Sequence, residues 1–217
     1  MTIAAAVLAV VVLWTWIGRA PSGGSDGYVA VQRRIEALAA NDDQAALIAE
    51  TRVKDEKAAC MAVRAMGRLR LKFKAASASG VRAAMKDPRP AVRQAATIAI
   101  SHAGNEKDTP VVSAVLIEDK SPSVRAAAAL TLGRMRAYTE METLLKALED
   151  DNMDVRRRAN AAIVKILGAS GGFNASDSPA RRQSSIAILR GMWSQMRVKT
   201  ETFYKARKKR MEAAEKK

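Results

Sequence analysis

The sequence predicts an all-α protein: an α-solenoid of about four helical hairpins, preceded by a single transmembrane helix and followed by a basic C-terminal helix. Three observations lead to this fold class. Hydrophobic residues make up 48% of the 217 residues but aromatic residues only 4%, and a surplus of small and aliphatic side chains favours closely packed helices over a β-sandwich. Aspartates recur at intervals of 32 residues before alanine-rich stretches, which indicates an internal repeat. Residues 1–18 contain no charged side chain.

Residues 1–18 predict a membrane anchor. A helix of this length spans about 27 Å, close to the thickness of the hydrocarbon core. Trp14 and Trp16 near its end, and Arg19 directly after it, are the residue types that favour the membrane interface. Two alternatives stay open. A cleaved signal peptide normally has a positive charge before the apolar run, which is missing here, and a buried core helix needs cover on every side.

The charges around this segment predict its orientation. Arg19, Arg33 and Arg34 all follow it, and positive charges resist translocation. We therefore expect a single-pass protein of the bacterial inner (cytoplasmic) membrane, with the bulk of the chain in the cytoplasm. Residues 19–27 are rich in glycine and serine, which predicts a flexible linker.

Residues 28–168 predict the repeat solenoid. Four aspartates lie 32 residues apart, each before a helical run: Asp55, Asp87, Asp119 and Asp151. An aspartate before a helix can accept hydrogen bonds from free backbone N–H groups. Shorter amphipathic segments precede these runs at residues 43–51, 79–86, 109–118 and 139–149, so each repeat is a helical hairpin. A helix over residues 28–40 caps the first hairpin, and stacking buries the apolar faces that one hairpin cannot bury alone.

The repeats resemble a known family. The pattern D-x-x-P-x-V-R-x-x-A-A over residues 119–128, with variants at Asp87 and Asp150, looks like the short HEAT repeat of the phycobilisome-lyase type, over about residues 43–168. The resemblance implies that the repeat aspartates and Arg93, Arg125 and Arg156 form a structural ladder along the stack. The same arginines could instead line a concave surface for an anionic partner. Members of the family act as scaffolds, assembly factors, bilin lyase subunits and, in a diverged branch, DNA glycosylases.

The C-terminal part predicts a loop over residues 169–185 and a helical basic tail over residues 186–217. The apolar start of the tail, residues 186–196, is expected to pack on the last repeat. The rest could lie on anionic lipids, bind an acidic protein, contact nucleic acid, or remain a solvated helix. The candidate docking residues are Arg197, Lys199, Lys205, Arg207, Lys208, Lys209 and Arg210.

Few residues could carry chemistry. His102 is the only histidine and Cys60 the only cysteine, and neither lies among other residues at metal-ligand spacing. The sequence predicts a helix-end position for His102, and a buried core position for Cys60 equivalent to Val92 and Val124. We therefore expect no catalytic residue, no metal and no cofactor, and predict that the protein is not an enzyme.

The combination predicts a membrane-tethered scaffold, an accessory or assembly subunit of a larger bacterial membrane complex. Its partners would be other subunits of that complex, recognised by shape and charge, with anionic lipids as a further contact. One alternative is a basic nucleic-acid-binding solenoid, which the net charge of +15 permits, although nucleic acid is the less expected partner. The other is a bilin-lyase-like enzyme subunit, for which the chain has no distinguishing residue.

Overall fold

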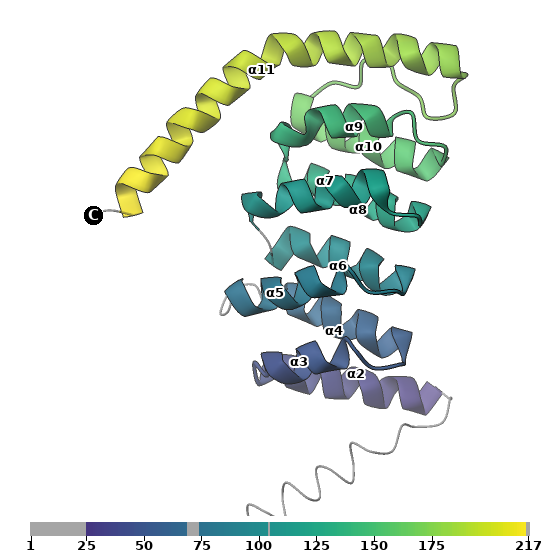
Figure 1. Ribbon diagram of the computed structural model, residues 1–217, viewed down its shortest axis with the longest axis vertical. Coiled ribbons are helices and arrows are strands. Elements are labelled where there is room, and N and C mark those ends of the chain that lie inside the picture. Colours follow the sequence, from purple (N-terminus) through teal and green to yellow (C-terminus); the bar gives the residue numbers. More distant parts are fainter. Residues whose placement is uncertain (1–24, 69–73, 104, 216–217) are drawn as a thin grey trace, which may run out of the picture.

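The computed structural model describes residues 25–68, 74–103 and 105–215 (Figure 1), and this part of the chain contains only helices and loops. The predicted all-α solenoid is confirmed. Its helices are α2 (Ser25–Ala40), α3 (Gln44–Glu50), α4 (Glu56–Arg68), α5 (Lys74–Ala84), α6 (Pro90–Ala103), α7 (Thr109–Glu118), α8 (Pro122–Met135), α9 (Met141–Ala147), α10 (Met153–Leu167) and α11 (Pro179–Glu215), with short 3-10 turns η1 (Glu106–Asp108) and η2 (Tyr138–Glu140).

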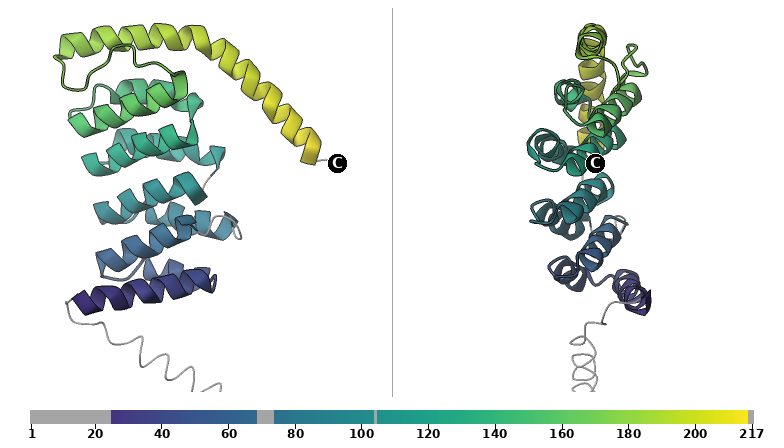
Figure 2. Two further views of the ribbon diagram at one scale, coloured as in Figure 1. Left: turned by 180° about the vertical axis from the view of Figure 1, so that it is seen from behind. Right: turned by 90° about the vertical axis from the view of Figure 1, so that its right-hand side faces the viewer.

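Four hairpins form the solenoid: α3–α4, α5–α6, α7–α8 and α9–α10. Their first helices (α3, α5, α7 and α9) form one column, and their second helices (α4, α6, α8 and α10) form the other (Figure 2, right). Helix α2 packs on α3 and α4 and extends the column of second helices. The hairpins overlap the segments that the sequence pattern predicts, but α5 begins at Lys74 rather than Ser79, and α2 begins at Ser25 rather than Tyr28.

Small residues let the second helices approach closely. Alanine is the commonest residue at their buried positions, and it offers little bulk between backbones. A Cβ atom built on Gly67 would lie 2.8 Å from the Cβ of Ala99, and one built on Gly133 would lie 2.8 Å from that of Ala162. Contacts at this distance exclude any side chain. The glycines therefore set the spacing between α4 and α6 and between α8 and α10.

Helix α11 closes the other end of the stack. Ile186, Leu189 and Trp193 are buried, so the first half of α11 covers the last hairpin, while its second half extends away from the solenoid (Figure 1). The helix begins at Pro179 and not at Ile186 as the pattern predicts. Residues 180–185 are mostly polar and exposed, so no apolar periodicity marks this turn, although proline suits the first turn of a helix.

The predicted anchor, residues 1–18 with Trp14 and Trp16, lies outside the described residues, as does Arg19. None of the helices in the described part of the chain is both long and apolar enough to cross a bilayer. Of the predicted linker, residues 25–27 are described, and they form the first turn of α2.

Candidate partner-binding surface

The predicted ladder joins the last three hairpins. Arg93 of α6 donates from Nε and Nη2 to the two carboxylate oxygens of Asp119, at 2.8 and 3.0 Å. Arg125 of α8 makes the same paired contact with Asp150, at 2.8 and 2.9 Å. The Nη1 group of each arginine donates to carbonyls in the turn before its own helix. Each arginine therefore ties its own turn to the turn of the next hairpin, with the planar geometry that suits a carboxylate.

The fourth hairpin departs from the predicted pairing in two ways. Asp150 pairs with Arg125, whereas Asp151, predicted from the even spacing, is an exposed residue of the turn that contributes a carbonyl. Arg156 is buried and has no carboxylate partner in the ladder: its Nε and Nη2 donate to the carbonyl of Ala175, at 3.0 and 2.8 Å. The last arginine of the series thus fastens the loop that leads into α11.

The first hairpin lies outside the ladder. Helix α4 begins one residue after Asp55, whose side chain accepts from the N–H groups of Lys57 and Ala58 at the helix start. In the other hairpins the helix begins three residues after the repeat aspartate. Measured from the helix start, Ala59 occupies the position of the ladder arginines. Cys60, although buried, is likewise not equivalent to Val92 and Val124.

Arg89 joins the first two hairpins instead. It pairs with Asp87 of its own turn through Nε and Nη2, both at 2.8 Å. Its Nη1 and Nη2 groups also donate backwards to the carbonyls of Val53 and Thr51, at 2.6 and 2.8 Å. A different arginine therefore performs the same inter-repeat function where the ladder residues are missing. Sequence reasoning missed Arg89 because it lies outside the repeated Val-Arg pair.

The ladder carboxylates have lowered pKa values. Burial of Asp119 opposes ionisation, but the hydrogen bonds from Arg93 and from the N–H of Ser121, with the charge of Arg93, outweigh it. For Asp150, burial is likewise outweighed by the bonds from Arg125 and the N–H of Asn152. Asp108, buried at η1 and paired with Arg82 of α5, follows the same rule. All three carboxylates are therefore ionised at neutral pH.

These shifts predict that acid weakens the solenoid. Because the folded pKa values lie below the ordinary value of 3.8, the stabilisation is complete above that value and is lost as the pH falls through the folded values. We expect the free energy of unfolding to decrease once the pH is lower than about 4. Urea titrations followed by circular dichroism at a series of pH values measure this decrease. The variant Asp119→Asn should be less stable at pH 7 and should lose less on acidification. An equal decline in both proteins would contradict this prediction.

The exposed face of the second helices (the second-helix face) carries a regular row of basic side chains. The thirteenth residue of each second helix is exposed, and these four residues are Arg68, His102, Arg134 and Lys165. We call them the basic row. None of the four has an ion pair with a described residue. Since the helices stack in parallel register (Figure 2, left), the row runs along one edge of this face.

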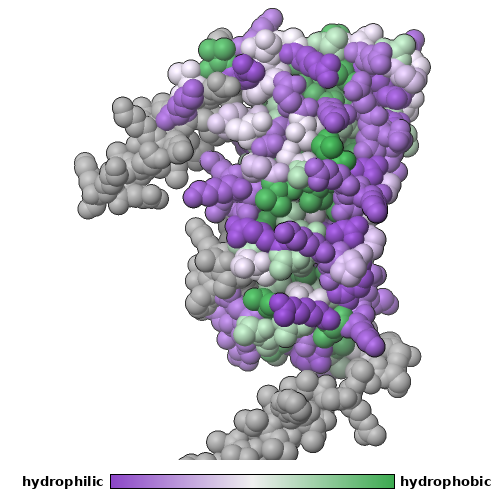
Figure 3. All heavy atoms as spheres, in the orientation of Figure 1, coloured by the Kyte–Doolittle hydropathy of each residue, from purple (hydrophilic) through white to green (hydrophobic). Residues whose placement is uncertain are grey.

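The middle of the second-helix face is less polar. The ninth residues of the four second helices are, in order, Arg64, Ile98, Leu130 and Ala161. The two in the middle, Ile98 and Leu130, are half-buried. The opposite face, formed by the first helices, has a mixed surface of charged side chains and small apolar patches (Figure 3). Charges of both signs are exposed there, including Lys146, Glu142 and Glu149 of α9 and the turn after it. The basic row therefore distinguishes the second-helix face.

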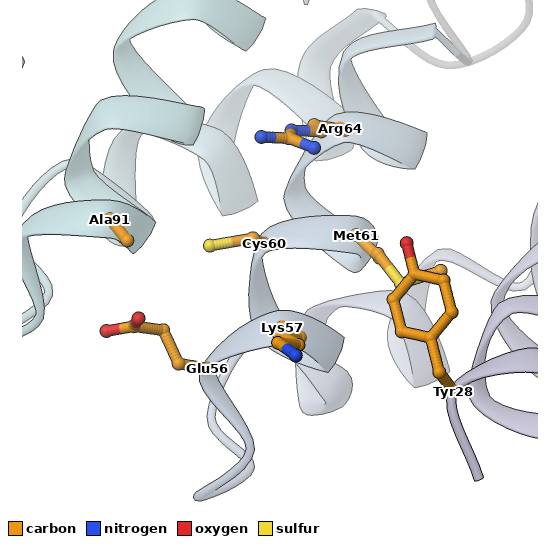
Figure 4. Close-up of a pocket in the computed structure, with 7 residues that line it drawn as sticks. All are labelled: Tyr28, Glu56, Lys57, Cys60, Met61, Arg64 and Ala91. Atoms are coloured by element: carbon orange, nitrogen blue, oxygen red, sulfur yellow. The ribbon is translucent and has the colours of Figure 1, made fainter. Parts of the chain in front are cut away.

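A groove (the α2–α4 groove) lies at the N-terminal end of the second-helix face. It consists of two adjoining hollows of about 490 and 500 Å³ that share Tyr28, Met61 and Arg64. In Figure 4 Met61 points toward Tyr28 of α2, while Cys60 points toward Ala91 of α6. Burial raises the pKa of the Cys60 thiol above its ordinary value of 9.0, so the thiol is protonated at neutral pH and contributes to the apolar floor.

The remaining candidate residues are spread over the molecule. His102 is exposed in the last turn of α6, as predicted. No cluster of potential metal ligands occurs among the described residues. The predicted docking residues Lys199, Arg207, Lys208, Lys209 and Arg210 lie on the second half of α11. The side chains of Arg197 and Lys205, on the same helix, are exposed. This half of α11 leaves the stack on the side where α4 and α6 end (Figure 1).

The comparisons with known proteins agree with this architecture. The family described as HEAT repeats matches residues 109–191, which span α7 to the start of α11. The similarity to HEAT repeats thus covers the C-terminal part of the solenoid. The matched part includes the ladder contact between Arg125 and Asp150, whereas the first hairpin, which departs from the ladder, lies outside the match. No curated protein sequence matches the chain.

Two solved structures are similar to this chain in fold. One is the complex of CpcE and CpcF of phycocyanin lyase from Nostoc sp. PCC7120, with 19% sequence identity and a TM-score of 0.50, which covers 68% of this chain and 97% of that chain. The other is an engineered protein from the Northeast Structural Genomics Consortium, with 13% identity and a TM-score of 0.50, which covers 78% of this chain and 90% of that chain. Both likenesses concern the fold alone.

Proposed function

We propose that this protein is a membrane-tethered HEAT-repeat scaffold without enzymatic activity, an accessory or assembly subunit of a bacterial inner-membrane complex. The tether is the apolar segment of residues 1–18, and the arginines that follow it favour a cytoplasmic solenoid. The observation that carries the proposal is the basic row on the second-helix face. Exposed basic side chains that have no ion pair with a described residue, held at regular spacing on a rigid stack, suit an acidic surface of another protein.

Two further observations support this function. The ladder and the glycine contacts fix the spacing of the second helices, so the face that they form is preorganised for binding. The phycocyanin lyase structure, which shares the fold, is a complex of two proteins. A solenoid of this kind recognises its partner through an extended surface, and the basic tail on α11 adds a second contact to the partner or to anionic lipids.

The experiment is a purification of the C-terminally tagged full chain from native membranes in a gentle detergent. We expect a membrane-protein complex to co-purify in fixed stoichiometry. Reversing the charge of the basic row with Arg68→Glu, Arg134→Glu and Lys165→Glu should reduce recovery of the partner at least tenfold. Truncation of the chain after Arg197 then measures the contribution of the tail.

The matched control reverses three exposed lysines on the first helices and their flanking turns, with Lys86→Glu, Lys107→Glu and Lys146→Glu. It changes the net charge equally but leaves the second-helix face intact, so the partner should be retained. Elution of the wild-type chain alone, or with nucleic acid, would contradict the scaffold function. Equal losses in the two triple variants would show that total charge, and not the basic row, governs binding.

A further inference from the structure

The α2–α4 groove differs from the other contacts between neighbouring second helices. Gly67 on Ala99 and Gly133 on Ala162 close the contacts of α4 with α6 and of α8 with α10. Between α6 and α8, the hydroxyl of Thr131 donates to the carbonyl of Thr97 at 2.8 Å, and both residues are buried. The groove lies between α2 and α4, and at one end it reaches Ala91 of α6. The second-helix face is thus hollowed where the regular repeat ends.

The floor of the groove is apolar. Met61 and Ile35 lie between the two helices, and Cys60, Ala65 and Ala39 extend the same surface. Tyr28 is 49% exposed at the side of the groove, in a chain where aromatic residues are only 4%. Exposed apolar surface of this kind gains free energy when a partner covers it.

The two rims of the groove carry different charges. The α4 rim presents Lys57, Arg64 and Arg68, which are exposed and have no ion pair with a described residue. The α2 rim presents Gln32 and Glu36, which are joined by a hydrogen bond of 2.8 Å. Glu56 lies at one end of the groove. A molecule bound in the groove would therefore contact three positively charged side chains on the α4 rim. On the α2 rim it would contact polar side chains, one of which is acidic.

Resting on the scaffold function proposed above, we propose that the α2–α4 groove binds an amphipathic helix of the partner protein, whose acidic residues line the edge that faces α4. Lys57 and Arg68, the outermost of these cations, are 11 residues apart on α4, or about 17 Å, which matches three turns of a bound helix. Its apolar side chains would cover Met61 and Tyr28, and its carboxylates would pair with Arg64 and its neighbours.

Fluorescence anisotropy with synthetic peptides tests this proposal on the full chain in mild detergent. The probe is a fluorescein-labelled 16-residue helix-forming peptide, with leucines along one face and glutamates along one edge. A second peptide carries lysine at every glutamate position. We expect the glutamate peptide to bind, with at least tenfold weaker binding in 300 mM salt than in 50 mM salt, and the lysine peptide not to bind.

Two variants locate the binding site. Arg64→Glu and Tyr28→Ala should each raise the Kd of the glutamate peptide at least tenfold, and Arg64→Gln should give an intermediate value. The control Lys146→Glu, on the first helices, should stay within twofold of the wild type. Thermal melts followed by circular dichroism check that each variant is folded, as expected for exposed positions.

The outcomes separate this inference from the proposed function. Equal binding by the wild type and Arg64→Glu, equal binding of both peptides, or no binding at 100 µM peptide would each overturn the groove assignment, even if the full chain purifies with a membrane complex. If the chain instead purifies alone while the groove binds the acidic peptide, the scaffold function within a membrane complex fails and the recognition chemistry stands.

Discussion

Replacement of Arg125 by alanine should lower the free energy of unfolding by about 3 kcal/mol, because it leaves an ionised carboxylate without its partner. Arg125 and Asp150 are 16% and 12% exposed, so water replaces the lost contact poorly. The substitution also removes the donors to the carbonyls of Asp119 and Lys120, and unpaired polar groups in a partly buried site add to the loss.

The position of Arg125 predicts where the solenoid weakens. In a repeat array the stability is close to a sum of hairpin and interface contributions, and this arginine joins the turn before α8 to the turn before α10. Hydrogen exchange should therefore accelerate most in α9, α10 and the start of α11, whereas α4 and α6 keep their protection. Urea titration measures the total loss, and exchange measured by mass spectrometry locates it.

Two controls test the assignment to the ladder. Arg134→Ala removes an exposed arginine of the same helix that has no ion pair with a described residue, and should change the stability by less than about 0.5 kcal/mol. A double-mutant cycle of Arg125→Ala with Asp150→Ala should give a coupling of about 1–3 kcal/mol. Independent, additive effects of the two substitutions would refute a ladder contact between these residues.

Replacement of Gly133 by leucine should lower the stability by about 3 kcal/mol as well, because α8 has no room for a side chain at this position. A Cβ atom there would lie 2.8 Å from the Cβ and 2.9 Å from the Cα of Ala162. The obstructing atoms belong to a backbone and its first carbon, so no rotamer change can make space, and the two helices must separate. Thermal and urea unfolding measure the loss.

The control for this prediction is a glycine in an open helical position. A Cβ atom on Gly191 of α11 would have no heavy atom of the described residues within 4 Å. Gly191→Ala should therefore raise the stability by about 0.5–1 kcal/mol, since alanine favours the helix, whereas Gly133→Ala should lower it. Stabilisation by both alanine substitutions would contradict the close contact between α8 and α10.

Much of the fold follows from local sequence patterns. The helical periodicity, the prolines at helix starts and the alanine-rich runs predict the hairpins at their observed positions, because helix formation and capping depend on neighbours within a few residues. The even spacing of 32 residues is a weaker guide to equivalence. The even spacing predicts Asp55 and Asp151 as ladder residues. In the structure Asp55 caps the start of α4, and Asp150 is the aspartate that pairs with Arg125. Counting from each helix start would also have found the basic row.

The sequence by itself thus determined that the described chain is a stack of helical hairpins, and it predicted that Arg93 and Arg125 pair with aspartates along the stack. The tertiary structure decided which residues the stack leaves exposed. The pairing of Arg89 with the first hairpin, the fastening of Arg156 to Ala175 and the groove beside Met61 all depend on turns and helices distant in sequence. Local periodicity describes one helix at a time, and only the packing of neighbouring helices determines which of its faces remains available to a partner.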